Sequence, residues 1–155
     1  MKTTSRAVTF LITPILLLTL APSLHAATDP VTPDAQALTE MEAQAKQANP
    51  RDQCYLYTEL VHAMTKIAVQ QIADGDDNGA NATLKEINYY AQLIQSNLAK
   101  NTKRLKNAQM LMDRTTAGLA EALHLTSDED RTGAQATLKQ LNLVQNQLLD
   151  QVFSH

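Results

Sequence analysis

Aromatic residues, cysteine and glycine are scarce in this 155-residue chain, which has no tryptophan, two phenylalanines, one cysteine and four glycines. A chain so poor in aromatic residues, with no compensating excess of valine and isoleucine, lacks the side chains that favour β-strands. Alanine, leucine, glutamine, asparagine, lysine and threonine dominate instead. We therefore predict an all-α protein.

The single cysteine, Cys54, excludes a disulfide within the chain. Stability must therefore come from side-chain packing. We interpret Cys54 as a small apolar residue buried between helices. The functional alternative is an intermolecular disulfide or a reactive thiol.

Basic residues are fewer than acidic residues. The chain has 13 basic and 16 acidic residues, and loss of Lys2 and Arg6 with the first 26 residues leaves a formal net charge of about −5. Nucleic-acid binding needs a basic surface that neutralises phosphates, so we expect no nucleic-acid partner. No nucleophile stands at a recognisable spacing from a base, and no Cys-x-x-Cys-His or His-Glu-x-x-His motif occurs. We expect no cofactor, and enzyme activity has no specific support.

The N-terminal residues have the order of a secretory signal. Lys2 and Arg6 precede an apolar run over residues 7–21. A run of about 15 residues is shorter than the ~20 needed to cross a bilayer, and the small residue Ala26 follows it. We predict a cleaved signal peptide over residues 1–26.

Export sets the expected compartment, which is periplasmic or extracellular. We predict an extended leader over residues 27–32 and a mature chain that is not an integral membrane protein. An uncleaved membrane anchor is the alternative. Residues 33–155 are enough for a single helical domain.

The mature sequence carries helical periodicity between clear breaks. Asn49, which precedes Pro50, separates a short first helix from a second helix over about residues 51–73. The turn-forming sequence DGDDNG at residues 74–79 ends the second helix. Ser127, followed by three acidic residues, predicts the start of a last helix that runs nearly to the C-terminus.

Residues 80–123 hold one heptad register without a phase shift and contain no proline. The seam positions are Leu84, Ile87, Ala91, Ile94, Leu98, Asn101, Leu105, Ala108, Met112, Thr115, Leu119 and Ala122. Such a register favours one long central helix within an elongated antiparallel helical hairpin, a coiled-coil-like bundle. The alternative is a tight turn at the polar stretch 99–103, which gives a compact up-and-down four-helix bundle.

The long-helix interpretation has a consequence for partners. The second and last helices would lie end to end along the long helix, and their apolar seams would be only half covered. Such a hairpin would require a protein partner, most simply a second copy of the chain. We therefore expect a homodimer or a complex with another protein.

The turn after the second helix matches the first half of a calcium-binding loop. Asp74, Asp76 and Asn78 stand at ligand positions of that loop. The closing acidic ligand is missing, because the twelfth position is Lys85. We favour a solvated turn between two helices, with weak calcium binding as the alternative.

Two Glu-x-x-His pairs occur on different predicted helices, Glu59 with His62 and Glu121 with His124. Helical bundles that hold two metal ions use this spacing, together with further inward-facing glutamates. One long helix would keep the pairs apart, whereas a compact bundle could bring them together. A metal-binding helical bundle is therefore the alternative function. The leading expectation is a non-enzymatic binding or structural protein of the cell envelope.

Overall fold

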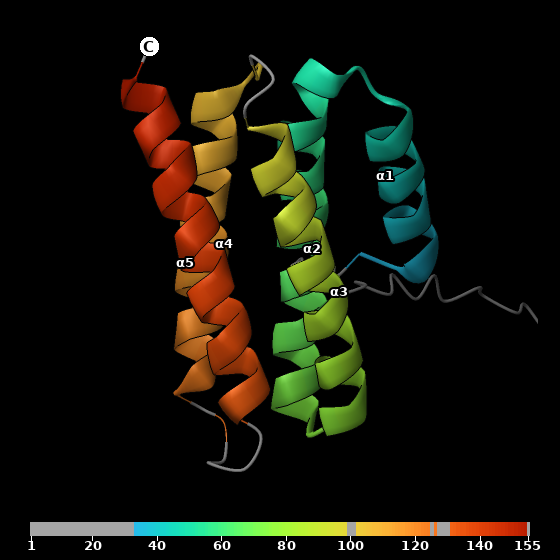
Figure 1. The fold of residues 1–155 in the computed structure, drawn as a ribbon. Helices are drawn as coiled ribbons and strands as arrows, with labels where there is room; N and C mark the ends of the chain where they lie inside the picture. Colours follow the sequence, from blue (N-terminus) through green and yellow to red (C-terminus); the bar gives the residue numbers. More distant parts are fainter. Residues whose placement is uncertain (1–32, 99–101, 125, 127–130, 155) are drawn as a thin grey trace, which may run out of the picture.

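The computed structural model describes residues 33–98, 102–124, 126 and 131–154. Five α-helices and no strand occur in these residues, which confirms the all-α prediction. The helices are α1 (Ala35–Gln47), α2 (Pro50–Asp74), α3 (Asp77–Asn97), α4 (Leu105–Leu123) and α5 (Arg131–Phe153), as Figure 1 shows. The predicted signal peptide, the leader over residues 27–32 and the predicted cap Ser127 lie outside the described residues.

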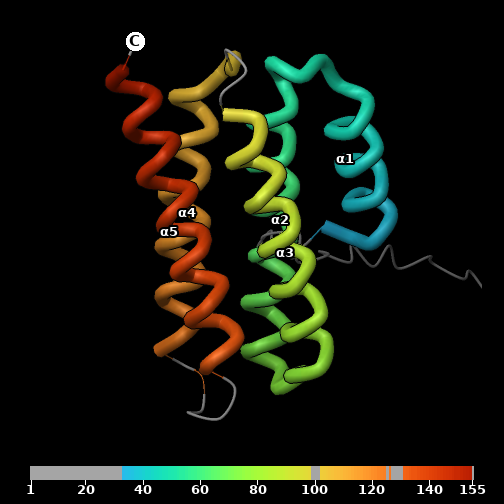
Figure 2. The backbone as a smooth tube through the Cα atoms, in the orientation of Figure 1, coloured from blue at the N-terminus to red at the C-terminus, as the bar shows by residue number. Residues whose placement is uncertain are grey.

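Four of the helices form a bundle built from two antiparallel hairpins, α2 with α3 and α4 with α5. The hairpins pack side by side, so that α2 contacts α4 and α3 contacts α5. The chain runs in alternating directions through the four helices, and α2 and α4 therefore run parallel (Figure 2). In the described part of the chain the backbones of α3 and α4 make no contact, so these two helices lie diagonally across the bundle from each other.

The prediction of one long helix over residues 80–123 is wrong, because α3 ends at Asn97 and a separate helix, α4, begins at Leu105. The hydroxyl of Thr102 donates to the carbonyl oxygens of Asn97 and Leu98, at 3.2 and 3.3 Å, and so caps the end of α3. Before α4, Arg104 adopts the left-handed backbone conformation, with φ of 56°. The compact alternative therefore describes the bundle.

Contacts with the start of α2 hold this break in place. The Lys103 backbone N–H donates to the Arg51 carbonyl oxygen at 2.8 Å. The Arg104 guanidinium lies 3.5 Å from the centre of the Tyr55 ring, a cation–π contact. Residues in the left-handed backbone conformation are usually glycine or asparagine. Because an arginine occupies this position, the sequence gives no recognisable signal for the turn.

The heptad pattern nevertheless identified the buried face of both helices. Its seam residues from Leu84 to Leu98, and from Ala108 to Ala122, are buried between the four helices. Fully buried side chains come from each helix of the bundle: Leu60 and Val61, Ile87 and Ile94, Met112 and Leu119, and Leu141, Val144 and Leu148. The large apolar side chains of one chain thus cover each other, without a second copy.

Helix α1 packs on the outside of the α2–α3 hairpin. The Asp34 carboxylate caps α1 by accepting the Ala37 backbone N–H at 2.7 Å. The Tyr90 hydroxyl on α3 donates to the Glu42 carboxylate on α1. Helix α1 therefore covers the α2–α3 face of the bundle and leaves the adjacent α2–α4 face open. No helix among the described residues is long and apolar enough to span a membrane.

Candidate functional site

The two Glu-x-x-His pairs lie on the parallel neighbours α2 and α4. A hydrogen bond of 2.9 Å joins the His62 Nδ1 atom to the Thr115 hydroxyl oxygen, so these two residues share one level of the bundle. Glu59 lies one turn to one side of that level. Glu121 lies six residues to the other side, about 9 Å along the axis at 1.5 Å per residue. The compact bundle therefore does not bring the two pairs together.

The environments of the outer residues agree with this separation. Glu59 accepts a hydrogen bond from the Tyr55 hydroxyl at 2.6 Å. His124 is exposed at the C-terminal cap of α4. Among the residues that the structure describes, no three His, Cys, Asp or Glu side chains are placed to hold a metal ion. The structure thus places the predicted metal ligands Glu59, His62, Glu121 and His124 as two separate pairs and does not bring them together.

The calcium-like residues form a tight helix–helix turn instead of a twelve-residue loop. Asp74 ends α2 and accepts from the Gln70 side-chain amide at 2.9 Å. Gly75 follows with φ of 72°, the left-handed conformation that ends many helices. The Asp76 carboxylate caps α3 by accepting the Gly79 backbone N–H at 3.0 Å, and Asn78 is already helical. The prediction of calcium ligands Asp74, Asp76 and Asn78 therefore lacks its loop geometry, and the solvated turn describes this segment.

Cys54 is fully buried, and burial raises the pKa of its thiol to about 12. A thiol reacts as the thiolate, which this environment disfavours strongly. The interpretation of Cys54 as a packing residue is confirmed.

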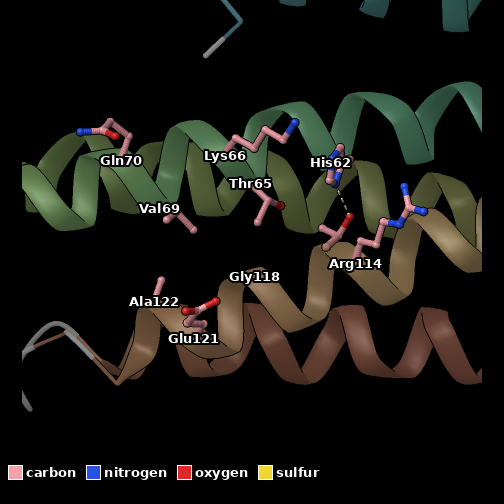
Figure 3. Close-up of a pocket in the computed structure, with 10 residues that line it drawn as sticks. His62, Thr65, Lys66, Val69, Gln70, Arg114, Gly118, Glu121 and Ala122 are labelled. Atoms are coloured by element: carbon pink, nitrogen blue, oxygen red, sulfur yellow. Dashed lines mark hydrogen bonds between the residues drawn. The ribbon is translucent and has the colours of Figure 1, made fainter. Parts of the chain in front are cut away.

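A groove of about 480 Å³ lies between α2 and α4, on the face that α1 does not cover. Ten residues line it, five from each helix: His62, Thr65, Lys66, Val69 and Gln70 from α2, and Arg114, Thr115, Gly118, Glu121 and Ala122 from α4. Figure 3 shows the side chains of Thr65, Val69 and Ala122 directed toward the space between the two helices, whereas those of Lys66 and Gln70 extend along α2. A volume of this size is typical of sites for small molecules.

The end of the groove away from His62 is lined by aliphatic side chains. Val69 on α2 and Ala122 on α4 lie there, next to Gln70. Gly118 supplies no side chain, and a Cβ atom added to it would meet nothing within 4 Å. The α4 backbone is therefore open to a bound molecule at this point.

One end of the groove is basic. Figure 3 shows the ammonium group of Lys66 extending toward His62, with the Arg114 guanidinium beyond it. Neither Lys66 nor Arg114 forms an ion pair with any residue in the described ranges. The single acidic lining residue, Glu121, lies two helical turns from Arg114. Positive charge is thus concentrated at one end of a groove in an acidic protein.

His62 is the half-buried member of this basic end. Burial lowers its pKa below the ordinary 6.5, and the nearby charges of Lys66 and Arg114 lower it further. The Thr115 hydroxyl donates to the Leu111 carbonyl oxygen at 2.8 Å, which leaves its oxygen as an acceptor for a proton on His62 Nδ1. The lowered pKa favours the neutral ring, and the tautomer that carries its proton on Nδ1 completes this hydrogen bond.

Sequence reasoning singled out His62 and Glu121 in the groove, but for a different chemistry. It missed Lys66, Arg114 and Gly118. Lys66 lies four residues after His62, and Gly118 four residues after Arg114, so each pair shares one helix face. That spacing was readable, but nothing in the sequence indicated that the two faces meet.

No protein-family model, curated protein or solved structure matches the chain. The function must therefore be argued from the geometry of the groove.

Proposed function

We propose that this chain is an exported, non-enzymatic binding protein of the cell envelope, and that the α2–α4 groove is its binding site. The observation that carries the proposal is the groove itself: a basic end at His62, Lys66 and Arg114, an open stretch at Gly118, and an aliphatic end at Val69 and Ala122. Ligand sites commonly combine apolar walls with a few placed polar groups.

The hydrogen bonds around His62 support binding over catalysis. A histidine that activates a hydroxyl nucleophile accepts its proton. Here the Thr115 hydroxyl bonds the Leu111 carbonyl oxygen at 2.8 Å as well as the His62 Nδ1 atom, so its single proton is not committed to the histidine. This pair is arranged to hold the His62 ring in place.

The envelope location rests on the sequence of residues 1–26. Expression of the full chain in a bacterium, followed by fractionation and N-terminal sequencing, tests it. We expect mature protein in the periplasmic fraction, beginning at Ala27. Full-length protein in the cytoplasmic fraction would contradict the proposed location.

The proposed partner is the ligand of the groove, and a second copy is not required. The expectation of a homodimer depended on half-covered seams along one long helix. In the bundle these seams are buried within one chain. The exposed large apolar residues that remain on described helices are Tyr89, Met110, Leu143, Leu149 and Phe153. Scattered exposed apolar side chains are normal on monomeric proteins.

A neutral fluorescent dye tests the groove without assuming the charge of its ligand. N-phenylnaphthylamine gains fluorescence in apolar sites, and we expect a saturable increase with this protein. Gly118→Leu should abolish most of the increase, because its side chain would enter the groove. Ala117→Leu is the matched control, since Ala117 is exposed on the same helix but does not line the groove. Equal dye binding by both variants would refute the proposed site.

A further inference from the structure

We infer that the groove takes an anionic amphiphile, a molecule with a carboxylate or phosphate head on an apolar chain. This inference rests on the proposed binding function and adds the chemical class of the ligand. The head would lie at the end formed by His62, Lys66 and Arg114. The chain would lie along Val69, Gly118 and Ala122.

The charges of the groove favour an anion over other heads. Lys66 and Arg114 flank His62 from two different helices, close enough that their charges disfavour its protonation. Like charges placed near each other without a counter-ion repel, and a bound anion would relieve that repulsion. No described acidic residue forms an ion pair with either cation, so both remain available to a ligand.

The donors of the basic end suit an oxyanion. The guanidinium of Arg114 presents several N–H groups in one plane, a geometry that matches carboxylate and phosphate oxygens. The Lys66 ammonium adds a point charge from the opposite helix. Protonation of His62 at Nε2 would supply a third donor, and an adjacent anion would favour that protonation.

The shape of the groove favours an elongated apolar part. His62 and Gln70 mark its two ends on α2, eight residues apart, or about 12 Å of helix. Between them Val69 and Ala122 supply aliphatic surface beside the threonines Thr65 and Thr115, and the missing side chain at Gly118 gives a bound chain access to the α4 backbone. A small inorganic anion would leave this apolar part of the groove uncovered.

Isothermal titration calorimetry on the mature chain tests the inference with four probes below their micelle concentrations. Decanoate and decyl phosphate carry the two anionic heads, decyl maltoside carries the same chain on a neutral head, and acetate carries a head without the chain. We expect both anionic decyl probes to bind at least about tenfold tighter than decyl maltoside and acetate. The tighter of the two anionic probes identifies the head group as carboxylate or phosphate.

Variants separate the head from the chain. Lys66→Gln with Arg114→Gln should weaken binding of the anionic probes about tenfold and leave decyl maltoside unchanged, since two exposed charge contacts are removed. Lys85→Gln with Lys139→Gln makes the same change in net charge at exposed sites outside the groove and should have no effect. Gly118→Leu should weaken binding of every decyl probe.

The outcomes distinguish this inference from the proposed function. If decyl maltoside binds as tightly as decanoate, and Gly118→Leu weakens both, the groove binds ligands but the inferred anionic class is wrong. If Gly118→Leu changes no affinity, both the site and the ligand class are refuted. Equal losses in the Lys66/Arg114 and Lys85/Lys139 variants would also overturn the inference, because they would show an effect of net charge alone.

Discussion

Two glycine-to-alanine substitutions should change stability in opposite directions, although both glycines lie in helices. Gly118 stands inside α4, and an added Cβ would meet nothing within 4 Å. Alanine is favoured over glycine in a helix interior by about 1 kcal/mol. Gly118→Ala should therefore raise the free energy of unfolding by about 1 kcal/mol and the Tm by about 4 °C for a domain of this size.

Gly79 occupies the first turn of α3, where an added Cβ would collide with the Asp76 carboxylate and lie 2.8 Å from the Gln71 Nε2 atom. Asp76 caps the helix through the Gly79 N–H, and the Gln71 side-chain oxygen accepts from the Thr83 hydroxyl. Gly79→Ala must displace the cap. Loss of the aspartate cap and of the Gln71–Thr83 hydrogen bond costs about 1 kcal/mol each, and the helix preference of alanine returns about 1 kcal/mol, so this variant should be destabilised by about 1 kcal/mol.

Thermal and urea unfolding followed by far-ultraviolet circular dichroism would measure both variants against the parent chain. Both variants introduce alanine into a helix, so the difference between their free energies of unfolding does not reflect a general effect of alanine on helix content. A neutral or destabilising Gly118→Ala would mean that α4 is packed against something at this point, and the open groove would be refuted. A stabilising Gly79→Ala would contradict the structure of the α2–α3 turn.

Three further predictions follow from burial and packing. Cys54 should not react with a thiol reagent in the folded protein and should react fully in denaturant, because burial raises its pKa to about 12; rapid reaction in buffer would contradict its burial. His62 should titrate below pH 6.5 by NMR, since burial, Lys66 and Arg114 disfavour its charged form. The unfolded chain therefore binds a proton at His62 more readily than the folded chain does. The free energy of unfolding should be highest above pH 6.5 and should decrease as the pH falls from 6.5 toward the folded pKa of His62; a folded pKa above 6.5 would refute this account. Light scattering at micromolar concentration should give the mass of one chain, and a dimer mass would contradict the packing of all seams within one copy.

The helices and their buried faces could be predicted because periodicity reports burial directly. The second helix, the turn at residues 74–79, and the heptad positions from Leu84 to Leu98 and from Ala108 to Ala122 match the structure. The break between α3 and α4 could not be predicted in the same way. It depends on Arg104 in a left-handed conformation, held by Tyr55 and the start of α2, and these are contacts between distant parts of the chain.

The candidate site was predictable only in part, for a related reason. Spacing places His62 and Lys66, or Arg114 and Gly118, on one face of a helix. It does not say which helices are neighbours, whether they run parallel, or at what level they meet. The His62–Thr115 hydrogen bond sets that level, and it separates the two Glu-x-x-His pairs while it brings Arg114 close to His62.

Amide chemical shifts measured by NMR during a titration with decanoate would test the central claim most directly. The account predicts that the largest shifts fall on the groove residues, above all the backbone amide of Gly118 and those of Thr65 and Val69. The exposed apolar residues Leu149 and Phe153 on α5 serve as the comparison. Large shifts confined to α5, with Gly118 unchanged, would contradict the claim that the α2–α4 groove is the binding site.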